Sequence, residues 1–277
     1  MSKVALIGQN SSLSGYLAES LSQSGLDHHL FSLRKISSMS SRKRIQFWNS
    51  LDSEFDVFVF SGAAIDPSLS EVTLDFLNYE IPIEGIEQLS KNGASMKFLT
   101  IGTALEGIAF DNRYISSKYR LSVKAADWKL PGWTHLRTHT LVGSARPPSH
   151  MLLGQLLEAV RTGSDFTIHG TRQVRQYLHY EQFAGFVTGL LSGLIIPSSA
   201  TPLVGASETT SILSLVKSMM FRFNSESKLY VNEELAWKTD QTSGTVRKND
   251  FELATATGEE LVGSLMEKWL SVSLEGE

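Results

Sequence analysis

A tyrosine and a lysine four residues apart, Tyr114 and Lys118, form the pair in this sequence that most directly indicates chemistry. Residues at this spacing lie on one face of a helix, one turn from each other. A nearby ammonium lowers the pKa of a phenol because it favours the phenolate. Such a phenol can give or accept a proton at a carbonyl or an alcohol near neutral pH. A surface helix with a cation beside an aromatic ring would show the same spacing, so the pair needs support from its surroundings.

A hydroxyl group precedes this pair at the end of an expected strand. Residues 97–101 predict a buried strand, which ends in Gly102 and Thr103. A threonine hydroxyl at a strand end, followed by a helix that carries Tyr114 and Lys118, indicates a site for alcohol or carbonyl chemistry. Whether a cofactor belongs there depends on the rest of the chain.

The composition is that of a globular protein with one large domain, or with a domain and a smaller lobe. The 277 residues are 42% hydrophobic and 19% charged, which is the ordinary range for such proteins. The net charge of −4 gives no basic field for nucleic acid, which is therefore not expected as a partner. The sequence contains no cysteine, which excludes disulfides, thiol catalysis and cysteine-ligated metals.

No part of the sequence predicts a membrane span, a signal peptide or a metal site. The longest apolar region, residues 183–197, is interrupted by glycine, serine and threonine and is too short to span a bilayer. The apolar run at residues 4–7 is too short for the core of a signal peptide. The seven histidines show no metal-ligand spacing. We therefore expect a cytoplasmic protein that binds neither a membrane nor a metal.

Strands and helices alternate along the first half of the sequence. Residues 4–7 are a continuous apolar run, and residues 56–60 are apolar after Asp56, as expected of strands that are covered on both faces of a parallel sheet. Helical segments separate the expected strands, and this alternation continues from residue 3 to residue 143. The pattern predicts an α/β protein with a right-handed, doubly wound parallel sheet.

The turn after the first strand has the position of a phosphate-binding loop. Residues 8–14 have the spacing Gly-x-x-Ser-x-x-Ser and lead into a helix, whose free N–H groups hold the pyrophosphate in dinucleotide-binding folds. Serine can hydrogen-bond to phosphate but lacks the freedom of glycine at positive φ. Ser61, Gly62 and Ala63, at the end of the third strand, are small enough for a flat ligand to pack on the backbone. A generic strand-to-helix turn is the alternative.

Basic residues follow the second expected strand, residues 29–33. Arg34 and Lys35 come directly after it, and no acidic residue lies between His28 and Leu51. An acid near this position suits the ribose 2′-hydroxyl of NAD, whereas an arginine suits the 2′-phosphate of NADP. The alternative is a solvated basic loop.

A second cluster of arginines lies in the segment 170–179. Arg172 and Arg175 stand in this segment, before Tyr177 and His179. The planar guanidinium group of arginine suits the oxygens of a diphosphate. A surface hairpin would explain the same residues without a ligand.

Together these segments resemble the extended short-chain dehydrogenase/reductases, the group of NAD(P)-dependent nucleotide-sugar epimerases, dehydratases and reductases. The resemblance runs in order from residue 3 to about residue 220. The glycine loop of the family matches Gly8, Ser11 and Ser14, and its arginine–x–tyrosine–x–histidine segment matches residues 175–179.

The resemblance implies a Rossmann fold, with functional positions that can be carried over one by one. Tyr114 and Lys118 match the tyrosine and lysine of the family. Thr103 matches its hydroxyl residue, and Asn78 its structural and catalytic asparagine. The implied cofactor residues are Gly8, Asn10, Ser11, Ser12, Leu13, Arg34, Lys35, Ser61, Gly62, Ala63 and Lys118, and the implied substrate residues are His139, Thr140 and Arg175.

The sequence departs from the family pattern in ways that bear on the reaction. Two of the three loop glycines are serines. The loop between Thr103 and Tyr114 is shorter than in the family, where it helps to shape the substrate pocket. Ala104 and Leu105 stand in place of the acid pair of sugar 4,6-dehydratases, which disfavours dehydration.

These features predict an NADPH-dependent reductase of a keto group on a nucleotide-linked 4-keto-6-deoxy sugar, with NAD(H) as the alternative cofactor. In this prediction Tyr114 gives a proton to the carbonyl oxygen and Thr103 hydrogen-bonds to that oxygen. Lys118 lowers the pKa of the tyrosine and holds the nicotinamide ribose. A nucleotide-sugar 4-epimerase, a reductase of a non-sugar ketone or aldehyde, and a nucleotide-binding protein with impaired catalysis remain as alternatives. A homodimer is left open.

The resemblance also predicts how the chain divides. Residues 1–145 form an NADP-binding Rossmann domain, which is rejoined by about residues 171–206. Residues 146–170 and 207–277 form a smaller lobe that binds the substrate.

Overall fold

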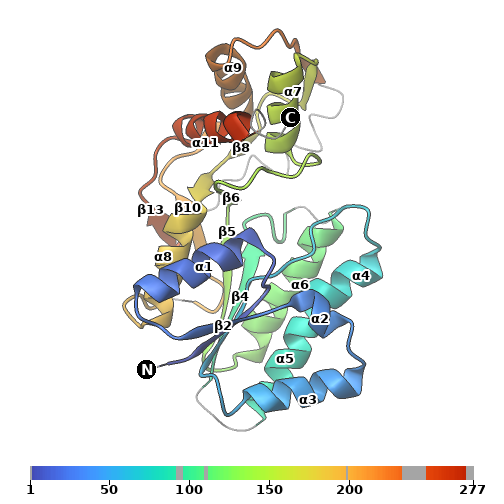
Figure 1. Cartoon of the computed structure of the whole chain (residues 1–277), viewed down its shortest axis with the longest axis vertical. Coiled ribbons are helices and arrows are strands. Elements are labelled where there is room, and N and C mark those ends of the chain that lie inside the picture. Colours follow the sequence, from blue (N-terminus) through green and yellow to red (C-terminus); the bar gives the residue numbers. More distant parts are fainter. Residues whose placement is uncertain (1, 92–95, 109–111, 198, 233–247, 273–277) are drawn as a thin grey trace. The chain divides into compact units, whose positions relative to one another are not determined.

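The chain folds into helices and strands along most of its length (Figure 1). The computed structural model describes residues 2–91, 96–108, 112–197, 199–232 and 248–272. Among the helices of these residues, none is both long and apolar enough to cross a membrane.

Contacts divide the chain into two compact units. The first consists of Met1–Thr138 and Glu181–Val204, and the second of His139–Tyr180 and Gly205–Glu277. These boundaries differ from the predicted ones most clearly at residues 171–180, which were expected in the Rossmann domain and lie in the second unit.

A seven-stranded sheet forms the centre of the fold, in the order β13-β10-β5-β4-β3-β1-β2. Its strands are β1 (Val4–Ile7), β2 (His28–Phe31), β3 (Val57–Phe60), β4 (Lys97–Thr103), β5 (Trp133–Thr138), β10 (Leu203–Ala206) and β13 (Phe251–Leu253). The pairings from β2 through β10 are parallel. Every residue of β1 and β3 is buried, because both faces of these strands are covered. The predicted α/β class and parallel sheet are confirmed.

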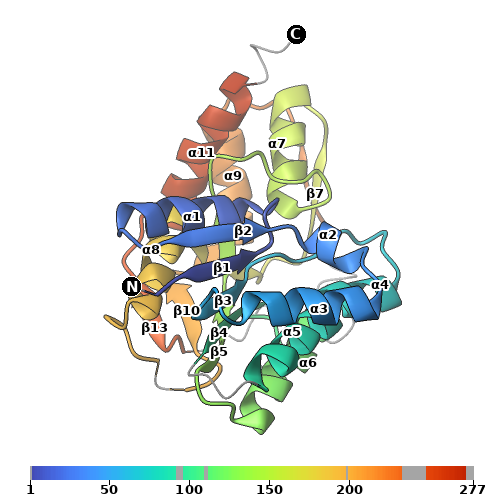
Figure 2. The same ribbon diagram turned by 60° about the horizontal axis from the view of Figure 1, so that its bottom comes forward.

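Helices cover both faces of the sheet in the first unit. They are α1 (Ser12–Gln23), α2 (Leu33–Ser37), α3 (Ser41–Leu51), α4 (Glu71–Asp75), the π-helix η1 (Phe76–Glu80), α5 (Ile81–Ser90), α6 (Arg113–Trp128) and α8 (Tyr180–Leu191). Figure 2 shows α1 and α8 on one face and α3, α5 and α6 on the other. A hydrogen bond of 2.8 Å between the hydroxyls of Ser20 and Thr188 joins α1 to α8.

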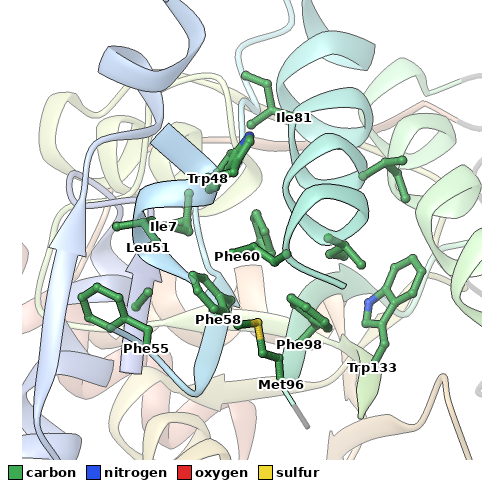
Figure 3. Packing of buried hydrophobic residues seen from close by; sticks show 14 of the residues in the cluster. Ile7, Trp48, Leu51, Phe55, Phe58, Phe60, Ile81, Met96, Phe98 and Trp133 are labelled. Atoms are coloured by element: carbon green, nitrogen blue, oxygen red, sulfur yellow. The ribbon is translucent and has the colours of Figure 1, made fainter. Parts of the chain in front are cut away.

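Large aromatic side chains fill the space between the sheet and α3, α5 and α6 (Figure 3). Trp48 of α3 and Phe58 of β3 are fully buried. Phe58 stacks on Phe98 of the neighbouring strand β4, with 6.0 Å between ring centroids. Burial of several such rings supplies much of the driving force that holds these helices on the sheet.

The basic residues after β2 lie on two helices, α2 and α3, and do not form the loop that was the alternative explanation. Arg44 of α3 is buried and forms a two-pronged contact with Glu84 of α5, with Nε and Nη2 each 2.9 Å from a carboxylate oxygen. Arg34 and Lys35 of α2 are exposed. Only some of the basic residues are therefore available to a ligand.

The second unit packs three helices around a core of its own. They are α7 (Leu152–Thr162), α9 (Ile212–Arg222) and α11 (Gly258–Val272). Its short strands are β6 (Thr140–Val142), β7 (Phe166–His169), β8 (Val174–Arg175), β9 (Tyr177–His179), β11 (Thr210–Ser211) and β12 (Leu229–Asn232). The chain passes from the first unit to the second between two strands, since β5 ends at Thr138 and β6 begins at Thr140.

Candidate active site

The turn between β1 and α1 lies in close contact with the end of β3. Gly8 has a φ of 141°, which favours glycine, and a Cβ placed on it would collide with the backbone nitrogen of Gly62. A Cβ on Gly62 would in turn lie 2.8 Å from the Cα of Gly8. The two glycines therefore let the two strand ends approach with backbone against backbone.

Three serine hydroxyls tie this turn together. The Ser14 hydroxyl lies 2.7 Å from the carbonyl oxygen of Gly8, to which it donates, and 2.7 Å from the Ser61 hydroxyl. Ser11 is the N-cap of α1, and its hydroxyl accepts from the backbone nitrogen of Ser14. Ser14 is fully buried. At the third position of the loop, the serine therefore supports the turn itself and does not offer its hydroxyl to a ligand.

The first turn of α1 has the features of an anion site. The first N–H groups of a helix have no partner within the helix and lie at the positive end of its dipole. Ser12 and Leu13 are the first residues of α1, and the exposed Asn10 precedes its N-cap. With the close approach of Gly8 and Gly62, this arrangement fits the pyrophosphate of a dinucleotide.

The end of β2 presents exposed cations. Ser32 caps the N-terminus of α2, with its hydroxyl accepting from the backbone nitrogen of Lys35. Arg34 is the second residue of this helix, and its side chain is exposed. An exposed guanidinium at this strand end can reach a phosphate without losing a contact inside the protein.

Asn78 is fully buried in η1, and its amide is used within the protein. The amide oxygen accepts from the backbone nitrogen of Ala64 at 2.8 Å, and the amide nitrogen donates to the carbonyl oxygen of Ala64 at 2.9 Å. The same nitrogen lies 3.3 Å from the hydroxyl of Ser117 on α6. Asn78 thereby fastens the chain after β3 to the helix that carries the tyrosine and the lysine.

The three predicted catalytic residues lie at the end of β4 and on α6. Thr103 is the last residue of β4, and Tyr114 and Lys118 lie one turn apart on α6. Asn112 caps this helix by accepting from the backbone nitrogen of Ile115. Thr103 and Tyr114 are partly exposed, whereas Lys118 is only 2% exposed. Local sequence thus places a hydroxyl, a phenol and an ammonium in the same unit, as the chemistry requires.

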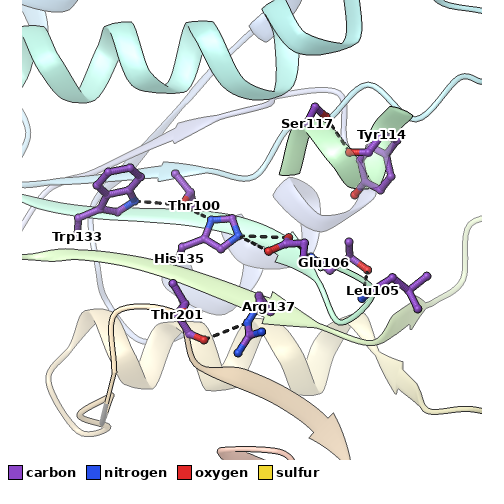
Figure 4. A network of polar contacts seen from close by, with 10 residues as sticks. Thr100, Leu105, Glu106, Tyr114, Ser117, Trp133, His135, Arg137 and Thr201 are labelled. Atoms are coloured by element: carbon purple, nitrogen blue, oxygen red, sulfur yellow. Dashed lines mark hydrogen bonds and ion pairs between the residues drawn. The ribbon is translucent and has the colours of Figure 1, made fainter. Parts of the chain in front are cut away.

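A buried network that the sequence did not reveal lies beside these residues (Figure 4). The indole nitrogen of Trp133 donates to the hydroxyl of Thr100 at 3.1 Å, and that hydroxyl lies 2.8 Å from Nδ1 of His135. Nε2 of His135 lies 3.1 Å from the nearer carboxylate oxygen of Glu106. The other oxygen of Glu106 accepts from the backbone nitrogen of Thr103 at 2.7 Å. The sequence signal was a histidine inside an apolar strand and an acid just after a strand end.

Burial and neighbouring charges shift the pKa values of Lys118 and Glu106. Burial lowers the pKa of Lys118 to about 8, and the negative charge of Glu106 opposes that shift. Burial would raise the pKa of Glu106. The contact with His135, the backbone N–H of Thr103 and the charge of Lys118 together bring the pKa of Glu106 below its ordinary value. Glu106 is therefore a carboxylate at neutral pH, and Lys118 is mostly an ammonium.

The predicted substrate residues all lie in the second unit, where strand pairing brings them together. β6 pairs in parallel with β9, with Thr140 opposite Tyr177. The backbone nitrogen of Thr140 donates to the carbonyl oxygen of Gln176 at 3.2 Å. Since Gln176 directly follows Arg175, the segments 139–140 and 175–177 form one cluster.

Burial shifts the pKa values of titratable groups in the cluster of residues 139–140 and 175–177. Burial lowers the pKa of His139 to about 4; the side chain of Asn249 opposes this shift, and the positive charge of Arg175 adds to it. Burial also raises the pKa of the Tyr177 phenol to about 12. Among the described residues, Nε2 of His139, the Tyr177 hydroxyl and Oδ1 of Asn249 are buried without a hydrogen-bond partner. Several unpaired polar atoms beside the partly buried Arg175 are suited to a polar or anionic ligand.

Solved structures of enzymes that act on nucleotide-linked sugars share this fold. An NAD-dependent NDP-hexosamine 5,6-dehydratase involved in tunicamycin biosynthesis is 13% identical, with a TM-score of 0.71 over 98% of each chain. A GDP-mannoheptose C4 reductase from Campylobacter jejuni with NADP bound is 11% identical, with a TM-score of 0.70 over 97% of this chain and 98% of its own. A UDP-glucose 4-epimerase from Thermus thermophilus in complex with NAD is 14% identical, with a TM-score of 0.65 over 96% and 98%.

These likenesses span nearly the whole chain and establish its fold. No protein-family model matches the sequence, and no curated protein matches it. The expected resemblance to the extended short-chain dehydrogenase/reductases is thus confirmed for the Rossmann-type fold, which the seven-stranded sheet also shows.

Proposed function

We propose that this protein is an NADPH-dependent reductase of a keto group on a nucleotide-linked sugar. The observation that carries the proposal is the position of Thr103, Tyr114 and Lys118, which lie at a strand end and on the following helix, in the unit that contains the candidate dinucleotide loop. The shared fold of reductases, dehydratases and epimerases of nucleotide-linked sugars supports it.

In the proposed reaction the protein's own residues handle the proton. NADPH, when bound, would supply a hydride to the carbonyl carbon. Tyr114 donates its phenolic proton to the carbonyl oxygen, and Thr103 donates a hydrogen bond to the same oxygen. The ammonium of Lys118 lies one turn from Tyr114 and favours the phenolate that remains. Because burial lowers the pKa of Lys118 to about 8, this support weakens as the pH rises above that value.

Cofactor and substrate are assigned to separate parts of the chain. The turn of Gly8, the exposed N-terminal region of α1 and the exposed Arg34 support NADP(H), with NAD(H) as the weaker ligand. The cluster of His139, Thr140 and Arg175 supports a diphosphate group in the substrate. A 4-keto-6-deoxy sugar linked to a nucleotide combines this diphosphate with a carbonyl group.

The test is turnover of NADPH by the purified protein with nucleotide-linked 4-keto-6-deoxy sugars. We expect one NADPH to be consumed for each alcohol formed, as followed by absorbance and mass spectrometry. Tyr114→Phe removes only the hydroxyl and should lower kcat by roughly a hundred- to ten-thousand-fold. Tyr119→Phe makes the same chemical change on the same helix and serves as the matched control.

Four outcomes would contradict the proposal or a part of it. Interconversion of two nucleotide-linked sugars without net consumption of NADPH would favour a 4-epimerase. Faster turnover of small ketones or aldehydes than of nucleotide-linked sugars would favour a non-sugar reductase. Binding of NADPH without turnover of any carbonyl would leave a nucleotide-binding protein. Equal rates for the wild type and Tyr114→Phe would remove the tyrosine from the reaction.

A further inference from the structure

The network of Trp133, Thr100, His135 and Glu106 has a direction that follows from its donors. An indole N–H can only donate, so the Thr100 oxygen accepts from Trp133. The Thr100 hydroxyl still carries its own hydrogen, and Nδ1 of His135 at 2.8 Å is its acceptor among the described residues. The proton of a neutral imidazole then lies on Nε2, which donates to Glu106. Each group in the series therefore donates to the next one, and the series ends at the Glu106 carboxylate.

The backbone has room for this contact because residue 102 is glycine. A Cβ on Gly102 would collide with the Glu106 carboxylate and with Nε2 of His135. The backbone nitrogen of Thr103 adds a further donor to Glu106. Thr100, Glu106 and His135 are each no more than 1% exposed. A carboxylate held by two donors and shielded from water is an ionised group with a fixed position.

Glu106 is the charged neighbour that acts on Lys118. The elements packed against α6 carry the charged or titratable groups Glu71 and Asp75 on α4, Tyr79 and Glu80 on η1, Lys97 on β4, and His135 and Arg137 on β5. On α6 itself, the other such groups are Arg113, Tyr114, Tyr119, Arg120, Lys124 and Asp127. Asp75 is already paired with Arg120 at 2.5 Å. In the part of the chain that the structure describes, Glu106 supplies the negative charge that opposes the effect of burial on Lys118.

We propose that Glu106, held by His135, is a positioning residue that keeps the buried Lys118 charged at the pH of the reaction. The inference rests on the proposed function, in which the Lys118 ammonium acts on Tyr114. Without the carboxylate, burial alone would act on Lys118, and the ammonium would lose its proton nearer to neutral pH. The Glu106–His135 pair would then set the upper limit of the pH range in which Tyr114 works.

The charge of Lys118 can be measured without a substrate. The protein is labelled with lysine enriched in carbon isotope at Cε, and NMR follows each signal with pH; the Lys118 signal is the one missing from Lys118→Met. Wild-type Lys118 should titrate near the value of about 8. In Glu106→Gln, which keeps the shape but removes the charge, it should titrate lower by about one pH unit or more. Titration at the same pH in both proteins would overturn the proposal.

Two control variants separate charge from structure. Glu84→Gln makes the same change at another hydrogen-bonded carboxylate of the first unit and should leave the Lys118 titration unchanged. Glu106→Asp retains a carboxylate and should recover part of the wild-type value. A shift of equal size in Glu84→Gln would show a general effect of destabilisation and would contradict the role of Glu106.

Variants of His135 keep the proposal testable if Glu106→Gln does not fold. His135→Leu removes the donor to Glu106, so Lys118 should titrate at a lower pH. His135→Gln retains an N–H donor at the same end and should titrate close to the wild type. Equal titration of Lys118 in His135→Leu and the wild type would remove His135 from the proposal.

Turnover gives a second readout that depends on the proposed function. The alkaline fall in kcat should move to lower pH in Glu106→Gln, in parallel with the NMR titration. If the wild type turns over no nucleotide-linked sugar, the proposed function falls while the NMR result on Lys118 stands. The failures of the two proposals are thus distinguishable.

Discussion

Lys118 combines burial with a positive charge, two properties that oppose each other. Moving an ammonium out of water is unfavourable unless a negative group compensates for the lost hydration. At 2% exposure, Lys118 depends on Glu106 for this compensation. A buried ammonium that lowers stability and is nevertheless present indicates a role in chemistry. The exposed Arg34 carries no cost of burial and is accessible to a ligand.

Arg34 should determine the preference between the two cofactors. We expect Arg34→Ala to weaken NADPH binding by about ten- to a hundred-fold and to leave NADH binding nearly unchanged, because a charge-assisted contact with phosphate is worth roughly 1.5–3 kcal/mol. Fluorescence titration with both cofactors measures this. Arg42→Ala removes an exposed cation on α3 and is the control. Tighter binding of NADH than NADPH by the wild type would show that Arg34 does not hold a 2′-phosphate.

Arg175 should determine the affinity for the substrate diphosphate. Arg175→Ala should raise the KM of a nucleotide-linked sugar by roughly ten-fold or more and leave NADPH affinity unchanged. Arg175→Lys should recover part of the loss, because an ammonium lacks the planar two-pronged geometry. Steady-state kinetics decides, with the exposed Arg172→Ala as the control. An unchanged KM in Arg175→Ala would favour a substrate without a diphosphate.

At the scale of the elements, the π-helix η1 connects the segment after β3 to α6, the helix that carries Tyr114 and Lys118. It continues α4 with one wider turn. Asn78 lies in this turn and binds both backbone groups of Ala64, after β3, and the hydroxyl of Ser117 on α6. A wide turn at this point holds the segment after β3 and α6 together.

Asn78 should therefore matter for stability as well as for catalysis. Asn78→Ala removes the hydrogen bonds of a fully buried amide to the N–H and C=O of Ala64, which we expect to lower the free energy of unfolding by about 2 kcal/mol or more. Urea denaturation followed by circular dichroism measures the change. Asn49→Ala, at an exposed position on α3, is the matched control and should change stability by less than about 0.5 kcal/mol. Equal stability of both variants would contradict the structural role.

At the scale of the whole molecule, the candidate groups are divided between two units. The proposed proton donor and the candidate cofactor loop lie in the first unit, and the candidate diphosphate residues lie in the second. Each unit has its own buried core. Each also contains buried titratable groups, which make its stability depend on pH in a way that can be measured separately.

His139 should make the second unit sensitive to acid. Its pKa is lowered to about 4 in the folded state, so between its ordinary value of 6.5 and pH 4 the unfolded chain binds more protons, and stability falls as the pH falls. His139→Gln cannot take up this proton and should lose less stability over the same range, by on the order of 2 kcal/mol after allowing for screening. Urea unfolding at several pH values tests this, with exposed His150→Gln as the control. Parallel pH curves for the wild type and His139→Gln would contradict it.

The sequence by itself determined the architecture and the order of the main functional segments. Continuous apolar runs such as residues 4–7 predicted buried parallel strands, because a strand covered on both faces needs apolar residues at every position. The helical spacing of Tyr114 and Lys118, and the hydroxyl of Thr103 at a strand end, are local features that need no knowledge of distant contacts.

Tertiary structure decided which side chains meet across long separations in the chain. Thr100 and His135 are opposite each other only because β4 and β5 pair in this register, and Glu106 reaches His135 only because Gly102 leaves space. Ser14 meets Ser61 in the same way, at the contact of two strand ends. Composition and periodicity specify which face of an element is buried, whereas the partner of a buried polar group depends on strand register and on close approach of the backbone.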